Sequence, residues 1–502
     1  MALSTRHTPT TSAIETARPV LVLVLSMLAM VTALLQTMVV PVLHQIGDAL
    51  NVSASAVGWA VTVNLLAAAV FTPILSKVGD IHGRRRVLIG ILVTVAAGSL
   101  LAAVTSSLAM LLIARAMQGV SFGLFPLSIG ILRASLPAHR LSSSMAIVSG
   151  AIGVGGGVGL VLTGLVLRDG GDYRRMFWLA LVVALVLVVC ALGTVPADDP
   201  HRHGRVDWIG GLLLGLSLVL LLLPLSQGHE WGWRSTATIG SFAGSVATFV
   251  LWGIVERHVR EPLVPLEMLR NRALMATHAA GMFIGFGMFT TFLVISAFVQ
   301  VPRELGYGFS ASVLQTSCIY LVPAATIGII TAPLGGYLLE RLSGRTTLII
   351  ASTLGLVGFA QMAVLHSQSW HLILGGVITN GAFSMGYAAL PALVVAEVRP
   401  EETAIANGVN SIARSIGSAL GSALVITLLS SRILANGHSP ESSFITVFIV
   451  GSIAMLTSIL IVVLGMRPST NGTDPRSAEE IEREHALSLG AEWAIFTEDR
   501  PS

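Results

Sequence analysis

The sequence predicts an all-α polytopic membrane protein with fourteen transmembrane helices. Hydrophobic residues make up 54% of the chain and charged residues only 11%, so the charges are too few to cover the surfaces of soluble domains. Apolar runs of membrane-spanning length also recur along the whole chain, separated by polar turns. The predicted spans lie near residues 19–43, 55–76, 87–105, 108–132, 141–167, 177–195, 208–226, 236–255, 275–299, 311–334, 346–366, 371–396, 404–430 and 444–466.

The first apolar run, 19–43, is too long for the core of a signal peptide and lacks a convincing cleavage site, so we expect it to remain as a span. Residues 1–18 and 467–502 are polar. An even number of spans predicts that these two tails lie on the same side of the membrane. Within the second tail, residues 478–489 have the pattern of a surface helix.

Basic residues predict the orientation. With the N-terminus inside, 21 of the 29 Lys and Arg residues fall in cytoplasmic segments, six in external segments and two in spans. Both termini are therefore expected in the cytoplasm, and the net charge of +3 reflects loop arginines rather than a nucleic-acid-binding surface. The near absence of lysine, with Lys77 alone, is typical of a GC-rich bacterial genome, so the expected location is a bacterial cell membrane.

The densest charge cluster in the first half is the turn at residues 76–86, between the second and third spans. Gly79 and Gly83 permit close helix approach and positive φ, and the Asp80 carboxylate can cap a helix or pair with a cation. Arg84 and the two arginines after it favour a cytoplasmic turn. A turn that only orients the chain is the alternative interpretation.

This pattern, Gly-Asp-x-x-Gly-Arg-Arg-Arg after a second span, resembles the signature loop of the major facilitator superfamily. The resemblance implies a conformational latch between two six-helix bundles. A weaker second copy, with Gly336, Glu340 and Arg345, follows the tenth span, so spans one to six are expected to repeat as spans nine to fourteen. Spans seven and eight are then an inserted pair, and the count of fourteen is similar to the drug:proton antiporter (multidrug efflux) branch.

The predicted organisation has six parts. They are a cytoplasmic tail (1–18), an N-terminal six-helix bundle (19–195), a linker with the inserted helix pair (196–255), an interfacial cytoplasmic linker (256–274), a C-terminal six-helix bundle (275–466) and a second cytoplasmic tail (467–502).

Two arginines lie within predicted spans, where a charged side chain is costly. Arg115, with Gln118 and the following glycine, is similar to the family's fourth-span motif, which implies that this arginine lines the central cavity and is linked to proton movement. Snorkelling of Arg115 to the external interface is the alternative. Arg414, in the thirteenth span, is expected either to line the cavity or to be a packing partner.

The fifth span carries glycines near one stripe at helical spacing, which would let another helix approach closely and slide. The stripe resembles the family's antiporter motif, although Gly159 is followed by leucine where proline is usual. Ordinary close packing is the alternative interpretation. The glycines in question are Gly150, Gly153, Gly157, Gly159 and Gly164.

Gln36 in the first span stands where many fourteen-span drug antiporters carry an aspartate, and it cannot titrate. Thr32 shares its face, with Asn64 as a plausible neighbour from span two. No Asp or Glu lies in the middle third of any predicted span. We therefore expect a cavity whose fixed charge is positive and a preference for neutral, zwitterionic or anionic substrates over lipophilic cations.

Proton coupling without an intramembrane carboxylate could use His44 or His278, which are otherwise interfacial histidines. Candidate substrate contacts are the aromatic residues Phe122, Tyr320 and Tyr387, which could instead be packed or lipid-facing.

The remaining patterns argue against an enzyme. Cys190 and Cys318 fall inside spans, so neither a disulfide framework nor a thiolate metal site is indicated. There is no metal-ligand cluster, nucleophile elbow or phosphate-binding loop, and no metal or cofactor is expected. The sequence thus predicts a secondary active transporter, monomeric by family expectation and coupled to protons, that exports small amphipathic compounds such as drugs or antibiotics. The alternatives are a facilitator, an exporter of a specific metabolite coupled to another ion, or a transporter-like sensor.

Overall fold

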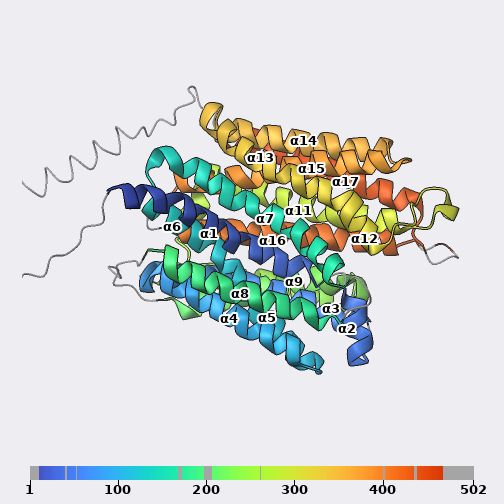
Figure 1. Cartoon of the computed structure of the whole chain (residues 1–502), viewed down its shortest axis with the longest axis horizontal. Helices are drawn as coiled ribbons and strands as arrows, with labels where there is room; N and C mark the ends of the chain where they lie inside the picture. Colours follow the sequence, from blue (N-terminus) through green and yellow to red (C-terminus); the bar gives the residue numbers. More distant parts are fainter. Residues whose placement is uncertain are drawn as a thin grey trace, which may run out of the picture.

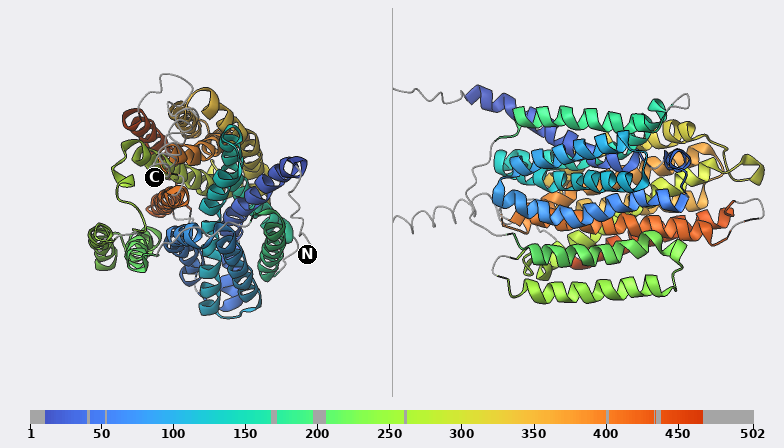
Figure 2. Two further views of the ribbon diagram at one scale, coloured as in Figure 1. Left: turned by 90° about the vertical axis from the view of Figure 1, so that its left-hand side faces the viewer. Right: turned by 90° about the horizontal axis from the view of Figure 1, so that it is seen from below.

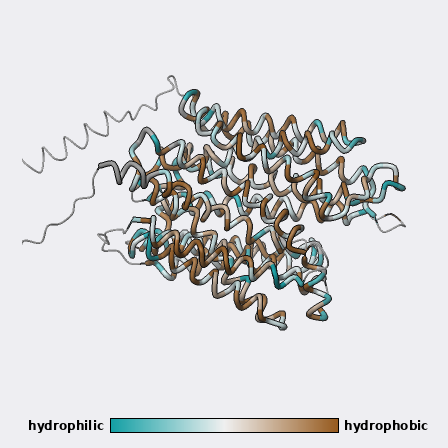
Figure 3. Tube along the Cα trace, viewed as in Figure 1, coloured by the Kyte–Doolittle hydropathy of each residue, from teal (hydrophilic) through white to brown (hydrophobic). Residues whose placement is uncertain are grey.

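The computed structural model describes residues 11–39, 42–52, 54–167, 172–196, 206–259, 262–399, 402–432, 434 and 438–466. These residues contain fourteen helices long and apolar enough to cross a membrane, which confirms the predicted number. The helices run side by side along the long axis of Figure 1, and hydrophilic residues gather towards their ends (Figure 3). Both predicted tails lie wholly or partly outside the described residues, as do residues 197–205 of the first linker.

The first half begins with α1 (Thr11–Thr37), and the predicted first span therefore ends earlier than expected. A short amphipathic helix, α2 (Leu43–Leu50), follows it and was not predicted. The fourth span is α5 and α6 joined by a 3-10 turn, η2. The other bounds in this half are α3 (Ala54–His82), α4 (Arg84–Val104), α5 (Leu108–Gly119), η2 (Val120–Gly123), α6 (Leu124–Ser135), α7 (Ala138–Val166) and α8 (Arg174–Thr194).

The second half begins with the ninth span, α11 (Arg272–Gln300), after a short turn, η3 (Met268–Arg270). The tenth span opens with a π-helical turn, η5 (Thr316–Leu321), which hydropathy alone does not reveal. The other bounds are η4 (Arg303–Leu305), α12 (Val313–Gln315), α13 (Val322–Arg341), α14 (Gly344–Val364), α15 (Ser369–Ala396), α16 (Thr403–Ser430) and α17 (Glu441–Gly465).

The two halves use the same helix pairings. In the first half α1 packs on α7, α3 on α5 and α4 on α8; in the second half the equivalent pairs are α11 with α16, α13 with α15 and α14 with α17. The halves meet along two seams, α7 against α13 and α3 against α16. Figure 2 shows them as two bundles side by side when viewed along the helices. The structure therefore has the predicted architecture of two six-helix bundles.

The inserted pair consists of α9 (Trp208–Trp231) and α10 (Thr236–Glu256) and lies outside both bundles, coloured green in Figure 2. α9 packs on α3 and α16, whereas α10 packs on α9. In the linker after α10, which the sequence predicts to be interfacial, Leu263 and Val264 are buried inside the protein, 0% and 2% exposed. The Glu256 carboxylate holds this linker by accepting a 2.6 Å hydrogen bond from the backbone N–H of Val264.

Within each half, glycines bring helix backbones into direct contact. At Gly417 on α16, an added Cβ would lie 1.8 Å from the carbonyl oxygen of Met282 on α11. At Gly155 on α7, an added Cβ would lie 2.2 Å from the carbonyl oxygen of Met30 on α1. No side chain fits at either position, so each bundle depends on these glycines for its closest helix pair.

We predict that Gly417→Ala lowers the free energy of unfolding by about 1–3 kcal/mol, because the new methyl group forces two backbones apart. Gly240→Ala on α10 is the matched control, since an added Cβ there meets no atom within 4 Å. The measurement is the thermal melting temperature of the purified protein in detergent. Equal melting temperatures for the two variants would contradict the packing described here.

Candidate functional site

Two adjoining cavities lie between the halves. They contain about 640 and 610 Å³ of space not filled by atoms, part of it open to solvent. Both are lined by the same four residues at their junction: Thr37, Gly156, Met288 and Phe289. Thr37 and Gly156 belong to the first half and Met288 and Phe289 to the second, so the cavities lie on the seam between the bundles.

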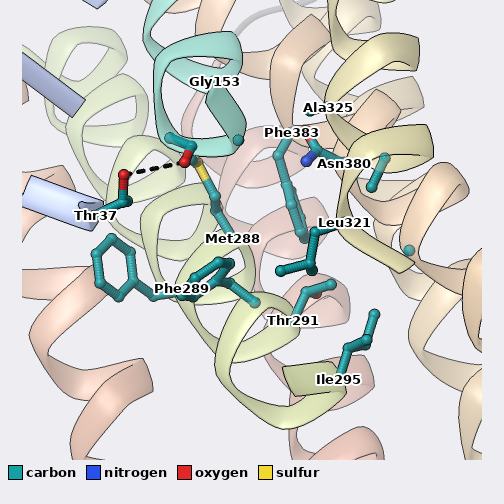
Figure 4. A pocket seen from close by; sticks show the side chains of 15 residues that line it. Thr37, Gly153, Met288, Phe289, Thr291, Ile295, Leu321, Ala325, Asn380 and Phe383 are labelled. Carbon is teal, nitrogen blue, oxygen red and sulfur yellow. Dashed lines mark hydrogen bonds between the residues drawn. The ribbon is translucent and has the colours of Figure 1, made fainter. Parts of the chain in front are cut away.

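The cavities follow one path along the helices. We call the end of the molecule with the 76–86 turn the loop end, and the opposite end the far end. The first cavity lies midway along the spans and includes Thr32, Gln36 and Arg414. The second is nearer the far end, where Ile295 of α11 and Gly376 of α15 line it. Figure 4 shows the second cavity, with Thr37 bonded to the Gly156 carbonyl at one side.

The first cavity contains five of the residues that the sequence analysis singled out: Thr32, Gln36, Phe122, Tyr387 and Arg414. Among the described residues that line the two cavities, Arg414 carries the only charged side chain. The lining is otherwise aromatic, aliphatic or neutral polar. The fixed charge of this space is therefore positive, as expected from the sequence.

Arg414 joins the two halves through its guanidinium. Its Cζ lies 4.6 Å from the ring centroid of Phe125 on α6 and 4.7 Å from that of Tyr387 on α15. Cation–π contacts of this kind are worth about 2 kcal/mol when they are shielded from water. Nη2 also donates a 2.9 Å hydrogen bond to the hydroxyl of Ser411, one turn earlier on α16.

Arg115 lies away from these two cavities, whereas the family resemblance implies that it lines the central one. It is fully buried inside the first bundle and is absent from the lining of both cavities. Its guanidinium donates to the carbonyls of Ala60 and Leu35, at 3.0 and 3.1 Å, and to Gln118 Oε1 at 2.6 Å. Arg115 therefore holds α5 against α1 and α3 through one backbone carbonyl of each helix.

Gln118 and Asn64 belong to this same buried network. Gln118 donates a 2.9 Å hydrogen bond to Ser99 on α4, and the Asn64 side chain donates a 3.0 Å hydrogen bond to the carbonyl of Arg115. Neither residue lines the two cavities. The network joins four helices of one bundle, so its direct effect is on the rigidity of the first half.

The glycines of the fifth span, α7, divide into two faces. Gly159 faces α1 of its own half, where an added Cβ would lie 2.3 Å from Thr37 Oγ1. The other four predicted glycines face the second half, where an added Cβ would meet side-chain atoms of Ala332, Ser384, Ala325 and Leu314. These glycines are Gly150, Gly153, Gly157 and Gly164, and Gly153 and Gly157 also line the second cavity.

The predicted latch residues of the first copy are held together at the loop end. Gly83 begins α4 with φ 99°, a conformation that strongly favours glycine. Arg84 donates to Asp80 Oδ1 from Nε and Nη2, at 2.9 and 2.8 Å, and to the carbonyl of Gly130 at 2.8 Å. At Gly79, an added Cβ would lie 2.3 Å from the Leu127 side chain. The turn is thereby fastened to α6.

The second copy corresponds to the first with a shift of one arginine. Ser343 precedes α14 as Gly83 precedes α4, with φ 149°. Arg345 donates to the Val463 carbonyl near the end of α17, as Arg85 donates to the Leu192 carbonyl near the end of α8. Arg345 is thus the counterpart of Arg85, and its bond stays inside the second half. Gly336 is buried, and the Glu340 side chain lies outside the described part.

Tyr320 and His278 are not among the residues that line the two cavities. Tyr320 donates a 3.0 Å hydrogen bond to Ser369 and stacks on Phe309, and it lines neither cavity. His278 is buried against Asn410 between α11 and α16. The His44 side chain lies outside the described part of the structure.

The described residues contain no group of three or more His, Cys, Asp or Glu side chains that could hold a metal ion.

Arg133 holds the two halves together at the loop end, a role that the sequence did not predict. Arg133, at the end of α6, was counted only among the orienting arginines. Its guanidinium donates to the carbonyls of Val398 and Arg399 and to the hydroxyl of Thr403, all in the second half. Nearby, an added Cβ at Gly408 would lie 3.1 Å from Ser76 Oγ. The halves are therefore in contact at the loop end, below the cavities.

We predict that Arg133→Ala opens the loop end. Ser76 is fully buried at this contact, so Ser76→Cys introduces a cysteine reporter there. The two native thiols are first removed by Cys190→Ser and Cys318→Ser. Hydrogen bonds from a charged donor contribute about 1.5–3 kcal/mol, so the maleimide labelling rate at the reporter should rise about tenfold or more.

The matched control is Arg140→Ala, which removes an exposed arginine from the same end of the molecule. It should leave the labelling rate at the parent value. A parent rate in Arg133→Ala as well would show that these hydrogen bonds do not hold the halves together.

Several residues that line the cavities were not predicted either. Among them are Phe125, Met288, Phe289, Asn380 and Phe383. Asn380 offered a signal, because it is an amide inside a span, and its Oδ1 accepts a 3.2 Å hydrogen bond from Ser384. The aromatic residues offered none, since apolar residues occur throughout the spans.

Solved structures share this architecture. The human organic anion transporter MFSD10 superposes with a TM-score of 0.60 at 17% identity, covering 88% of this chain and 99% of its own. The proton:xylose symporter XylE superposes with a TM-score of 0.61 at 15% identity, covering 91% and 98%. At these identities the likeness concerns the fold.

Curated relatives are similar over most of the chain. Multidrug resistance protein 3 of Bacillus subtilis is 26% identical over 72% of this chain and 70% of its own. The tetracenomycin C resistance and export protein of Streptomyces glaucescens is 26% identical over 80% and 74%. The probable actinorhodin transporter of Streptomyces coelicolor is 27% identical over 75% and 66%.

The family model of the Major Facilitator Superfamily matches residues 25–422 and, in a second match, 324–500. Together with the two bundles and the cavity between them, this match shows that the chain is a membrane transporter rather than an enzyme, and that it belongs to the major facilitator superfamily.

Proposed function

We propose that this transporter exports small amphipathic compounds, such as drugs or antibiotics, by alternating access. The observation that carries the proposal is the cavity on the seam between the halves, lined by aromatic and neutral polar side chains from both. Relatives named for multidrug resistance, for tetracenomycin C resistance and export, and as a probable actinorhodin transporter support the same substrate class.

The mechanism follows from what holds the halves together. At the loop end, Arg133 and the Ser76–Gly408 contact close the path, while the second cavity extends towards the far end. Opening the loop end requires these contacts to break while α7 moves against α13. We propose that the loop end is cytoplasmic, with both termini inside, on the basis of the 21 basic residues assigned to that side.

Proton coupling is the next step of the proposal. The resemblance of the fifth-span glycines and Arg115 to antiporter motifs supports antiport. Gln36 favours a second candidate, facilitated export or export coupled to another ion, because it lines the cavity where a carboxylate could have titrated. His278 is not among the residues that line the described cavities.

The test is substrate-triggered proton movement in proteoliposomes with an internal pH dye and a panel of neutral, anionic and cationic drugs. Export coupled to protons predicts that a preset pH gradient collapses only when a transported drug is present. Drug flux without proton flux would support the second candidate. Absence of drug-dependent flux for the whole panel would contradict drug export.

We predict that Asp80→Asn reduces transport severalfold without reducing membrane insertion. The carboxylate is nearly buried, with 8% of its side chain exposed, and its bonds to Arg84 fix the turn that α3 and α4 share. Losing the ionic partner weakens a charged hydrogen bond worth about 1.5–3 kcal/mol. Initial transport rates and the amount of protein in the membrane are measured together.

Asp172→Asn is the matched control. Asp172 is an exposed aspartate that also lies near an arginine, with 3.9 Å between Asp172 Oδ2 and Arg174 Nη1, but at the far end. It should transport at the parent rate. Full transport by Asp80→Asn would remove the 76–86 turn from the mechanism.

A further inference from the structure

We infer that Arg414 is the recognition group for an acidic oxygen on the transported molecule, so that the cavity selects flat aromatic anions. The inference rests on the proposed export function and specifies its substrate class. It is drawn from the hydrogen-bonding state, the surroundings and the position of this one guanidinium.

Arg414 has a hydrogen-bond donor group without an acceptor in the described part of the protein. Arg414 is 6% exposed, and its Nη1 is buried without a hydrogen-bond partner in the described part of the protein. A guanidinium has five N–H donors and no acceptor. A buried donor of a charged group that lacks an acceptor destabilises the protein, and a ligand oxygen that accepts from it would remove that cost.

The other buried arginines have different surroundings. Arg84 is neutralised by Asp80. Arg115 donates to two backbone carbonyls and an amide oxygen, and its buried Nη2 also lacks a partner in the described part of the protein, but this arginine lines neither cavity. Arg414 donates to the hydroxyl of Ser411 and faces no carboxylate among the described residues that line its cavity. Its positive charge is therefore the one that the cavity leaves for a ligand to balance.

The aromatic rings around Arg414 limit the form of the ligand. The rings of Phe125 and Tyr387 contact the guanidinium carbon, so a ligand reaches the group through its free N–H donors. Planar oxygen acids bind arginine in this way, with two parallel hydrogen bonds. Phe122, Phe289 and Met288 line the same cavity and offer apolar surface to an aromatic body attached to that acid.

The experiment measures binding of two probes of the same shape to the purified full chain in detergent. Tritiated 2-naphthoate carries a carboxylate, and 2-naphthamide is its neutral counterpart. Scintillation proximity gives the Kd of the first, and competition gives that of the second. We expect 2-naphthoate to bind about tenfold tighter or more, as one charge-assisted bidentate contact requires.

Arg414→Gln should reduce this preference to about one, because the charge and most of the donors are lost. If that variant does not fold, Arg414→Lys decides, since lysine keeps the charge without the planar fork and should lower the preference severalfold. Arg432→Gln, an exposed arginine just beyond the same helix, should keep the parent preference.

Three results would overturn the inference: no binding of 2-naphthoate, equal binding of the two probes to the parent protein, or an unchanged preference in the Arg414 variant that folds. Because binding is measured without transport, a negative result would contradict the substrate class and leave the export proposal untouched. Continued export of neutral drugs beside an absent anion preference would remove only the substrate class assigned here.

Discussion

Polar groups inside a membrane-spanning bundle must find their partners within the protein, because hydrocarbon offers none. The two arginines in the middle of the spans meet this constraint differently. Arg115 donates from Nε and Nη1 to carbonyls and an amide oxygen of its own bundle, and thereby fixes the first span, the second and the fourth relative to one another. Arg414 lies on the seam, with aromatic rings from both halves and one hydroxyl around it. Arg115 therefore stabilises the first bundle, whereas Arg414 keeps a hydrogen-bond donor available for a ligand at the seam between the bundles.

The glycine contacts follow the same division. Inside each half, the glycines let two backbones touch, since an added Cβ would lie against backbone atoms. Gly155 beside Met30 and Gly417 beside Met282 are examples. Between the halves, Gly150 and Gly157 face the methyl groups of alanines on α13. Backbone-to-backbone contacts interlock helices, whereas a surface of glycine facing alanine is smooth and contains few groups that a shift would leave unpaired. The packing thus makes each bundle stiff and the seam between them the place where movement costs least.

Hydropathy predicted the fourteen spans because they depend on length and composition, which a sequence states directly. It could not predict which way a polar side chain faces. Arg115 and Arg414 are similarly deep in their spans, yet only one reaches the cavity, since a rotation of the helix decides between them. Arg133 was missed for a related reason: an arginine at the end of a span orients the chain in any membrane protein, and its partners are 265 or more residues away. The π-helical turn η5 escaped because it changes hydrogen bonding and not hydrophobicity.

A ligand drives a conformational change only if its affinity differs between the two states. In the alternating-access scheme proposed above, Arg414 and Tyr387 move with the second half, whereas Phe125 moves with the first. The ring of Phe125 therefore shields the guanidinium from water in the state described here and moves relative to it when the halves rock. Electrostatic attraction to an anion depends steeply on such shielding, because the effective dielectric constant falls from about 80 in water to about 20 or less inside a protein. The same arginine would then hold an anionic substrate tightly in one state and loosely in the other, without any change in its own helix.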